Sequence, residues 1–244
     1  MPLIFSDEFR IHTYEVDARG QITLPMLCRF MQETASHHAS TLGFGYEDLM
    51  KNEHIWVLTA LRIHMLRYPH WKETLTVQTW PTIHERLYYW RDFKFLNDRE
   101  EVLGMATTQW VVLDGRRRRP VRNSVGFEFP ENPPPPVLEG GIDKVGEILN
   151  PGETHEYIVH YHDLDVNKHV NNVRYLEWIL YPIPMETWDS RSISDLTIQF
   201  QAEAGIGEQL VLKLEDKGNE TTGELVREDN RSICRASITW QKES

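Results

Sequence analysis

Four consecutive prolines, Pro133–Pro136, divide this chain of 244 residues more firmly than any other feature of its sequence. Proline fixes φ and lacks a backbone N–H, so such a run forms neither a helix nor a central strand and favours stiff polyproline II geometry. Gly140 and Gly141 follow shortly after. The length suits one large domain or two compact ones. We therefore expect one domain at residues 1–128, a linker at 129–150 and a second domain at 151–244.

The two halves have the same order of elements. Apolar residues at helical spacing predict one helix in each half, and β-rich segments bounded by turn residues follow it. This order predicts an internally duplicated α+β fold, in which an antiparallel sheet wraps around a central helix in each half. The expected helices are 22–42 and 170–181, and the expected strands are 75–82, 87–96, 102–113, 196–201, 209–215, 224–227 and 233–241.

An ungapped comparison of the halves supports the duplication. Tyr14–Gln21 matches His162–His169, and both segments lead directly into the predicted helix. Tyr68–Leu75 likewise matches Glu203–Leu210. Only the second half keeps reactive groups at these positions, which predicts one active site per chain.

Composition narrows the class of protein. Hydrophobic residues make up 40% and charged residues 26%, as in soluble globular chains. The net charge of −11 disfavours binding to nucleic acid or anionic membranes. No apolar run reaches the roughly 18 residues that span a bilayer, and the first residues lack the blocks of a signal peptide. Two cysteines exclude a disulfide scaffold, so we expect a cytoplasmic protein.

Three alternating residues before the second helix could perform chemistry. In extended backbone, Asp165, Asn167 and His169 would share one face. His169 could hold or pass a proton, oriented by Asp165, and Asn167 could donate to a developing oxyanion, as could the N–H groups that open the helix at Val170. Glu203 could act as a base on water or as a nucleophile. The alternatives are a helix-capping segment for the first three residues and a solvated surface carboxylate for Glu203.

Seven segments spread over nearly the whole chain point to one family: Tyr161–Leu180, Met31–Ala35, Ile55–Thr59, Arg67–Trp71, Gln78–Trp80, Arg91–Asp92 and Trp110–Val112 with its arginine tail. In these segments the chain resembles the plant and bacterial acyl–acyl-carrier-protein thioesterases. The resemblance implies a tandem hot-dog fold that hydrolyses the thioester between a fatty acyl chain and acyl carrier protein, ending chain elongation. It assigns catalytic roles to Asp165, Asn167, His169 and Glu203. Plant members often have a cysteine directly after the glutamate, whereas this chain has Ala204, which excludes a Cys–His acyl-enzyme there.

Two further features keep more than one interpretation, and a third argues against a metal site. The arginines Arg116–Arg119 with Arg122 are either a solvated strand end or a docking site for the acidic carrier protein. Apolar residues of the first helix, among them Phe30 and Ala35, form core, line an acyl tunnel, or do both. His37 and His38 point about 100° apart on a helix, and the two cysteines are isolated, so we expect no metal or other cofactor.

Other activities remain as alternatives at this stage. The first is a thioesterase that acts mainly on acyl-CoA. The second is a hot-dog dehydratase, against which the Asn167 amide and the lack of a second His-bearing copy argue. The third is a non-catalytic module that binds acyl-ACP. A homodimer is left open, and the sequence gives neither the acyl chain length nor the saturation preference.

Overall fold

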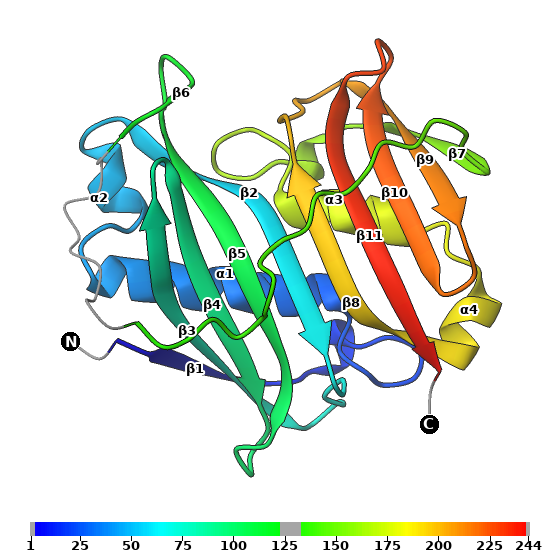
Figure 1. Cartoon of the computed structure of the whole chain (residues 1–244), viewed down its shortest axis with the longest axis horizontal. Helices are drawn as coiled ribbons and strands as arrows, with labels where there is room; N and C mark the ends of the chain where they lie inside the picture. The colour runs from blue at the N-terminus through cyan, green and yellow to red at the C-terminus, as the bar shows by residue number, and fades with distance from the viewer. Residues whose placement is uncertain (1–2, 123–132, 243–244) are drawn as a thin grey trace. The chain divides into compact units, whose positions relative to one another are not determined.

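A computed structural model describes residues 3–122 and 133–242 (Figure 1). The chain divides into two compact units, one of Met1–Thr59 with Ile63–Gly141 and one of Ala60–Arg62 with Ile142–Ser244. The division after Gly141 falls within the predicted linker 129–150, of which residues 129–132 lie outside the described residues. The limits of the domains and of the linker stay a prediction.

The first unit has one long helix against an antiparallel sheet. Its strands follow the order β1-β3-β4-β5-β2, with β6 paired to β5. Figure 1 shows α1 crossing one face of this sheet. The elements are β1 (Phe5–Arg10), a 3-10 turn (Thr13–Glu15), α1 (Leu24–Thr41), α2 (Tyr46–Met50), β2 (His54–Met65), β3 (Thr74–Glu85), β4 (Tyr88–Leu96), β5 (Val102–Asp114) and β6 (Arg119–Pro120).

Helix α1 begins and ends where local chemistry requires. The Thr23 hydroxyl accepts the Met26 N–H at 3.3 Å, and Pro25 lies in the first turn, where no N–H is needed. Gly43 adopts φ +78°, a left-handed conformation that ends the helix at little cost. The helix is therefore slightly shorter than the predicted 22–42. Its buried face packs against β1 and β3, and Leu75 and Val77 of β3 are fully buried.

The second unit repeats this plan. Its strands follow the order β8-β11-β10-β9-β7, and α3 packs on β9, β10 and β11. Gly223 on β10 permits close packing, since a Cβ there would lie 2.7 Å from Ile179 of α3. The elements are β7 (Glu153–Ile158), a 3-10 turn (Tyr161–Asp163), α3 (Asn172–Leu180), α4 (Met185–Ser190), β8 (Arg191–Phe200), β9 (Gln209–Asp216), β10 (Glu220–Arg227) and β11 (Ser232–Lys242).

The described part of the predicted linker has no helix or strand, and its backbone N–H groups donate hydrogen bonds to side chains of the strands. The Val137 N–H donates to Asp92 Oδ2 at 3.1 Å within the first unit. Within the second unit, Ile148 N–H donates to the buried carboxylate of Glu224 at 3.0 Å. These bonds tie each part of the segment to a strand of its own unit.

Six helices and strands have no counterpart in the sequence prediction: β1, β2, β6, β7, α2 and α4. The two edge strands β1 and β7 alternate half-buried with exposed positions and bury little apolar surface. The other predicted strands are present, several of them longer than expected. Strand β8 begins at Arg191 rather than at residue 196, because its polar first residues pair with β11.

Candidate active site

The segment before α3 is a hydrogen-bonded turn organised by Asp165. Its Oδ1 accepts the N–H of Asn167 at 2.8 Å and of His169 at 3.3 Å, and its own N–H donates to the His169 carbonyl at 2.8 Å. Lys168 has φ +64°. The expectation of extended backbone for this segment is wrong, because Asp165 holds it in a turn. Its carboxylate orders the backbone rather than the imidazole ring.

The N–H groups at the start of α3 are already engaged. Val170 N–H donates to the Ala204 carbonyl at 3.0 Å, and Asn171 N–H donates to the Asp163 carbonyl at 2.8 Å. The Asn171 side chain accepts the Val173 N–H at 2.9 Å and caps the helix, which therefore starts at Asn172 and not at Val170. The N–H groups of Val170, Asn171 and Val173 are thus used within the fold, and a contribution of the helix start to an oxyanion site stays a prediction.

The turn brings His169 close to Glu203, which follows β8. The distance from His169 Nε2 to Glu203 Oε2 is 3.7 Å, and each side chain is about one-third exposed (33% and 32%). This is an ion-pair distance, and both groups remain open to a small molecule. The Asn167 amide lies in the same turn and is half-buried, and its contact with Asp165 Oδ2 is long at 3.5 Å.

Two buried groups hold the backbone next to Glu203. Ala204 N–H donates to the Tyr175 hydroxyl of α3 at 2.9 Å, while the Ala204 carbonyl accepts from Val170. Burial raises the pKa of Tyr175 well above its usual value, so its phenol stays neutral and can accept this bond. The loop that carries Glu203 is thereby attached both to α3 and to the residue that follows His169.

Two residues that the sequence analysis did not identify, Glu208 and Arg227, hold the loop that carries Glu203. Arg227, the last residue of β10, donates from Nε to Glu208 at 2.8 Å and from Nη2 to the Glu203 carbonyl at 2.6 Å. Glu208 also accepts the Gly205 N–H at 3.0 Å. The ungapped comparison of the two halves contained a signal for Glu208, because it aligns Glu208 with Glu73 of the first half.

The first unit repeats the turn without the reactive groups. Asp17 Oδ1 accepts the N–H of Arg19 at 2.9 Å and of Gln21 at 3.1 Å, as Asp165 does in the second unit. Ile22 N–H donates to the Pro69 carbonyl at 2.9 Å, as Val170 does to Ala204. Tyr68 holds the position that matches Glu203 and is buried. Histidine and glutamate are thus replaced by Gln21 and Tyr68.

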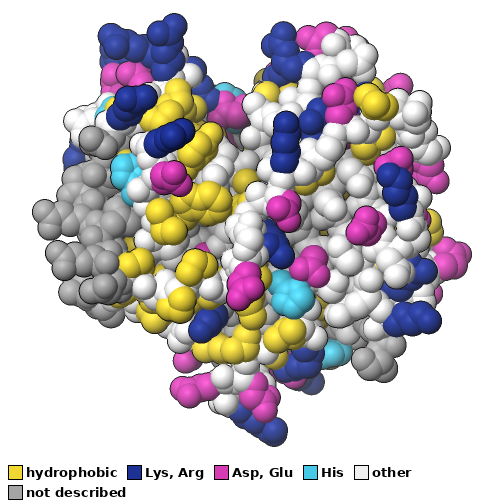
Figure 2. All heavy atoms as spheres, in the orientation of Figure 1, with side chains coloured by type: hydrophobic (Ala, Val, Ile, Leu, Met, Phe, Trp, Pro, Cys, Tyr) yellow, Lys and Arg dark blue, Asp and Glu magenta, His cyan; other side chains and the backbone are white. Residues whose placement is uncertain are grey.

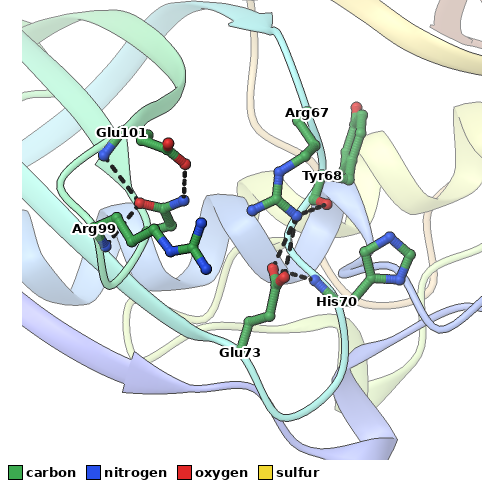
Figure 3. Close-up of polar contacts among 7 residues, drawn as sticks. Arg67, Tyr68, His70, Glu73, Arg99 and Glu101 are labelled. Carbon is green, nitrogen blue, oxygen red and sulfur yellow. Dashed lines mark hydrogen bonds and ion pairs between the residues drawn. The ribbon is translucent and has the colours of Figure 1, made fainter.

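Figure 3 shows the loop after β2 in which Tyr68 lies. Arg67 Nη1 donates to both carboxylate oxygens of Glu73, at 3.2 and 3.0 Å, and to the Tyr68 carbonyl at 3.5 Å. His70 N–H donates to Glu73 at 3.0 Å, the counterpart of the bond from Gly205 to Glu208. The duplication therefore extends to the individual hydrogen bonds of the two loops.

Other chemistry-bearing side chains lie elsewhere. Cys28 and Cys234 are buried and are not in a disulfide. His37 bonds to Asp7, and His38 contacts Arg91. Within residues 3–122 and 133–242, no group of three or more His, Cys, Asp or Glu residues is arranged to hold a metal ion. In the same residues, no helix is long and apolar enough to cross a bilayer.

The predicted basic cluster forms the tip of the hairpin β5–β6. Arg116–Arg119 are all exposed, and Arg116 forms an ion pair with Glu53. Figure 2 shows Lys and Arg side chains gathered where Figure 1 labels β6. The cluster is therefore on the surface, although no contact of it identifies a partner.

Comparison with known proteins establishes the family. The model for the acyl-ACP thioesterase N-terminal domain matches residues 2–126, and that for the acyl-ACP thioesterase C-terminal domain matches residues 147–242. The chain belongs to the acyl-ACP thioesterase family, which confirms the resemblance found in the sequence.

Individual relatives support the same assignment. A chloroplastic palmitoyl-acyl carrier protein thioesterase from Gossypium hirsutum is 32% identical over 98% of this chain and 64% of its own length. A chloroplastic acyl-[acyl-carrier-protein] hydrolase from Cuphea viscosissima is 29% identical over 98% of this chain and 62% of its own. The chain thus spans less than two-thirds of the length of these relatives.

Solved structures confirm the α+β fold of two tandem hot-dog domains. The 12:0-ACP thioesterase from Umbellularia californica matches with a TM-score of 0.90 and 25% identity, over 100% of this chain and 99% of that one. An acyl-ACP thioesterase from Bacteroides thetaiotaomicron matches with a TM-score of 0.83 and 27% identity, over 98% of both chains.

Proposed function

We propose that this protein hydrolyses the thioester of fatty acyl-ACP, releasing free fatty acid and holo-ACP and so ending chain elongation. The observation that carries the proposal is the pair of His169 and Glu203, 3.7 Å apart, in the second unit only. A base and a proton donor at this separation suit hydrolysis. Membership of the acyl-ACP thioesterase family supports the substrate class.

In the proposed mechanism, Glu203 is the general base. It takes a proton from water as the water oxygen forms a bond with the thioester carbon. The Asn167 amide donates to the resulting oxyanion. The C–S bond then breaks, and the His169 imidazolium gives its proton to the leaving thiolate. Transfer of the proton from Glu203 to His169 restores both groups, and the product acid loses its proton to solvent.

Asp165 has a supporting role in this proposal, because it fixes the turn that presents Asn167 and His169. A cysteine nucleophile has no support, since Ala204 follows Glu203 and both cysteines are buried elsewhere. We further propose that residues 1–128 bind the acyl chain and residues 151–244 perform the reaction, because the first copy lacks the reactive pair.

Purified protein assayed on acyl-ACP substrates from short to long chains, with matched acyl-CoA substrates, tests the proposal. Release of free thiol is the measurement. We expect kcat/KM for the preferred acyl chain to be at least tenfold higher on the carrier protein than on CoA. Equal or better rates on CoA would support an acyl-CoA thioesterase. Binding of acyl-ACP without thiol release would indicate a non-catalytic module.

The isolated, reduced cysteines support a reducing compartment, and we propose the cytoplasm. Fractionation of cells that express the protein tests this location. Association into a homodimer stays a prediction, which light scattering of the purified protein tests.

A further inference from the structure

The loop of residues 203–208 carries the proposed base and is held at both ends by one side chain. Arg227 Nη2 donates to the Glu203 carbonyl at 2.6 Å, and Arg227 Nε donates to Glu208 Oε2 at 2.8 Å. The second oxygen of Glu208 accepts the Gly205 N–H at 3.0 Å. The guanidinium therefore bridges the first and last residues of the loop.

The chemistry of this bridge favours rigidity. A guanidinium is planar and presents its donors in a fixed fork, so two bonds from one arginine set the separation of their acceptors. Both side chains are partly buried, Arg227 at 25% and Glu208 at 36% exposure, which reduces competition from water. A lysine could make one of these bonds but could not bridge both acceptors in the same geometry.

Glu208 is ionised in this setting. Burial tends to raise its pKa, but the bonds from Arg227 and the Gly205 N–H, with the positive charge of Arg227, hold the pKa below its usual value. The negative charge also lies close enough to His169 for the two groups to interact electrostatically. The pair is thus a charged pair beside the proposed site.

We propose that Arg227 and Glu208 are positioning residues that hold the backbone of Glu203 against His169 during turnover. This inference rests on the function proposed above. The Arg227 bond fixes the carbonyl of Glu203, and Ala204 is fixed by Tyr175 and Val170. Neither Arg227 nor Glu208 needs to touch the substrate for this role.

The first unit supplies a matched control. Arg67 pairs with Glu73, which accepts the His70 N–H in the equivalent turn (Figure 3). Tyr68 lies in this loop at the position matching Glu203, so an arginine–glutamate pair is present here without a base to position. Its arginine differs in origin, because Arg67 directly precedes Tyr68 in the chain whereas Arg227 comes from β10. Removing the pair here should cost stability only.

The experiment compares Arg227→Met, Arg227→Lys and Arg67→Met for kcat and KM on acyl-ACP, with folding monitored by circular dichroism and thermal unfolding. We expect kcat of Arg227→Met to fall roughly 10- to 100-fold with KM within about threefold of the parent, because small displacements of a reacting group carry penalties of this size. Arg227→Lys should recover part of the loss, and Arg67→Met should keep kcat within about twofold.

A second pair of variants covers the case in which Arg227→Met does not fold. Glu208→Gln should lower kcat by about 3- to 10-fold, while Glu73→Gln should not change it. A folded Arg227→Met or Glu208→Gln variant with the kcat of the parent overturns the inference, as does an equal loss from the first-unit control.

Glu203→Gln, measured alongside, separates this inference from the proposed function. If Glu203→Gln retains activity, the assignment of the base is wrong. If Glu203→Gln is inactive and Arg227→Met is fully active, only the positioning role is wrong.

Discussion

Cys28 and Cys234 are buried in different units and lie outside the loop that carries Glu203. Burial raises the pKa of Cys28 to about 12 and that of Cys234 further still, so neither forms the thiolate that nucleophilic attack requires. We predict that a Cys28→Ser/Cys234→Ser variant keeps kcat within about twofold of the parent when folded. A folded double variant that loses more than about tenfold would return a cysteine to the mechanism.

His37 provides a pH-dependent contact between α1 and β1. Its Nδ1 lies 2.7 Å from Asp7 Oδ2 and its Nε2 lies 3.0 Å from Glu33 Oε1. The hydrogen bond with Asp7 is the main cause that raises the pKa of His37. A raised pKa means that the folded state binds the proton more tightly. The contact therefore stabilises the fold fully at pH values below the pKa of the histidine in the unfolded chain, about 6.5. This stabilisation is lost as the pH rises through the higher pKa of His37 in the folded protein.

We expect the difference in free energy of unfolding between the parent and His37→Gln to favour the parent at about pH 5.5 and to approach zero above about pH 8. The side chain is 49% exposed, so the effect should stay below about 1 kcal/mol. Denaturant unfolding at several pH values measures it. A difference that grows toward high pH would contradict the assignment.

At the scale of residues, the sequence was sufficient to name the candidate pair of His169 and Glu203, but not the groups that hold it. Arg227 and Glu208 meet because the hairpin β9–β10 pairs Arg227 with Leu210, and the pattern of residues does not reveal that register. The alternation of Asp165, Asn167 and His169 suggests extended backbone, because a sequence pattern does not reveal a carboxylate that accepts backbone N–H groups.

At the scale of elements, substitutions in helix α1 test whether the first unit determines the preferred length of the acyl chain. Phe30 is buried and stacks on Phe9, with ring centroids 4.1 Å apart, and Ala35 is buried on the same helix. We predict that Phe30→Ala shifts the preference to longer chains and Ala35→Phe to shorter ones, by one or two carbon pairs. Each buried methylene of the substrate contributes about 0.8 kcal/mol, which is enough for such a shift.

Thiol release from the acyl-ACP panel measures the chain-length profile. Phe30→Ala can cost about 3–5 kcal/mol of stability, so Phe30→Leu and Ala35→Val serve as milder variants if either protein unfolds. Unchanged profiles in folded variants would show that α1 does not line the acyl site.

The strands of the sheets differ in how clearly the sequence predicts them. Strands β4 and β5 are rich in aromatic and apolar residues and stand out in the sequence. The edge strands β1 and β7 bury only alternate positions, and their pairing with β3 and β9 defines them. Helix α3 starts two residues later than its apolar pattern suggests, because Val170 bonds across the turn and Asn171 is the cap.

At the scale of the whole molecule, the net charge of −11 opposes approach of an acidic carrier protein. Arg117 and Arg119 lie exposed at the tip of the hairpin β5–β6 and could attract it locally. We predict that reversing both to Glu raises KM for acyl-ACP strongly and leaves kcat at saturation unchanged. Hydrolysis of a small acyl-CoA should be nearly unaffected, because this substrate lacks the carrier surface.

The control reverses two exposed cations of the second unit, Lys217 and Arg231, to Glu, which produces the same change in net charge. The parent should also lose efficiency on acyl-ACP as salt rises, since screening acts over about 8–10 Å. If both double variants behave alike at every salt concentration, the hairpin is a solvated turn and not the docking site.

Replacement of Glu203 by Gln tests the central claim most directly. Gln keeps the size of the side chain and its capacity for hydrogen bonding but cannot accept the proton of water. Steady-state kinetics on the preferred acyl-ACP should show kcat lowered by roughly 10²–10⁴, the range for loss of a general base, with KM nearly unchanged. A turnover within about threefold of the parent would remove Glu203 from the mechanism.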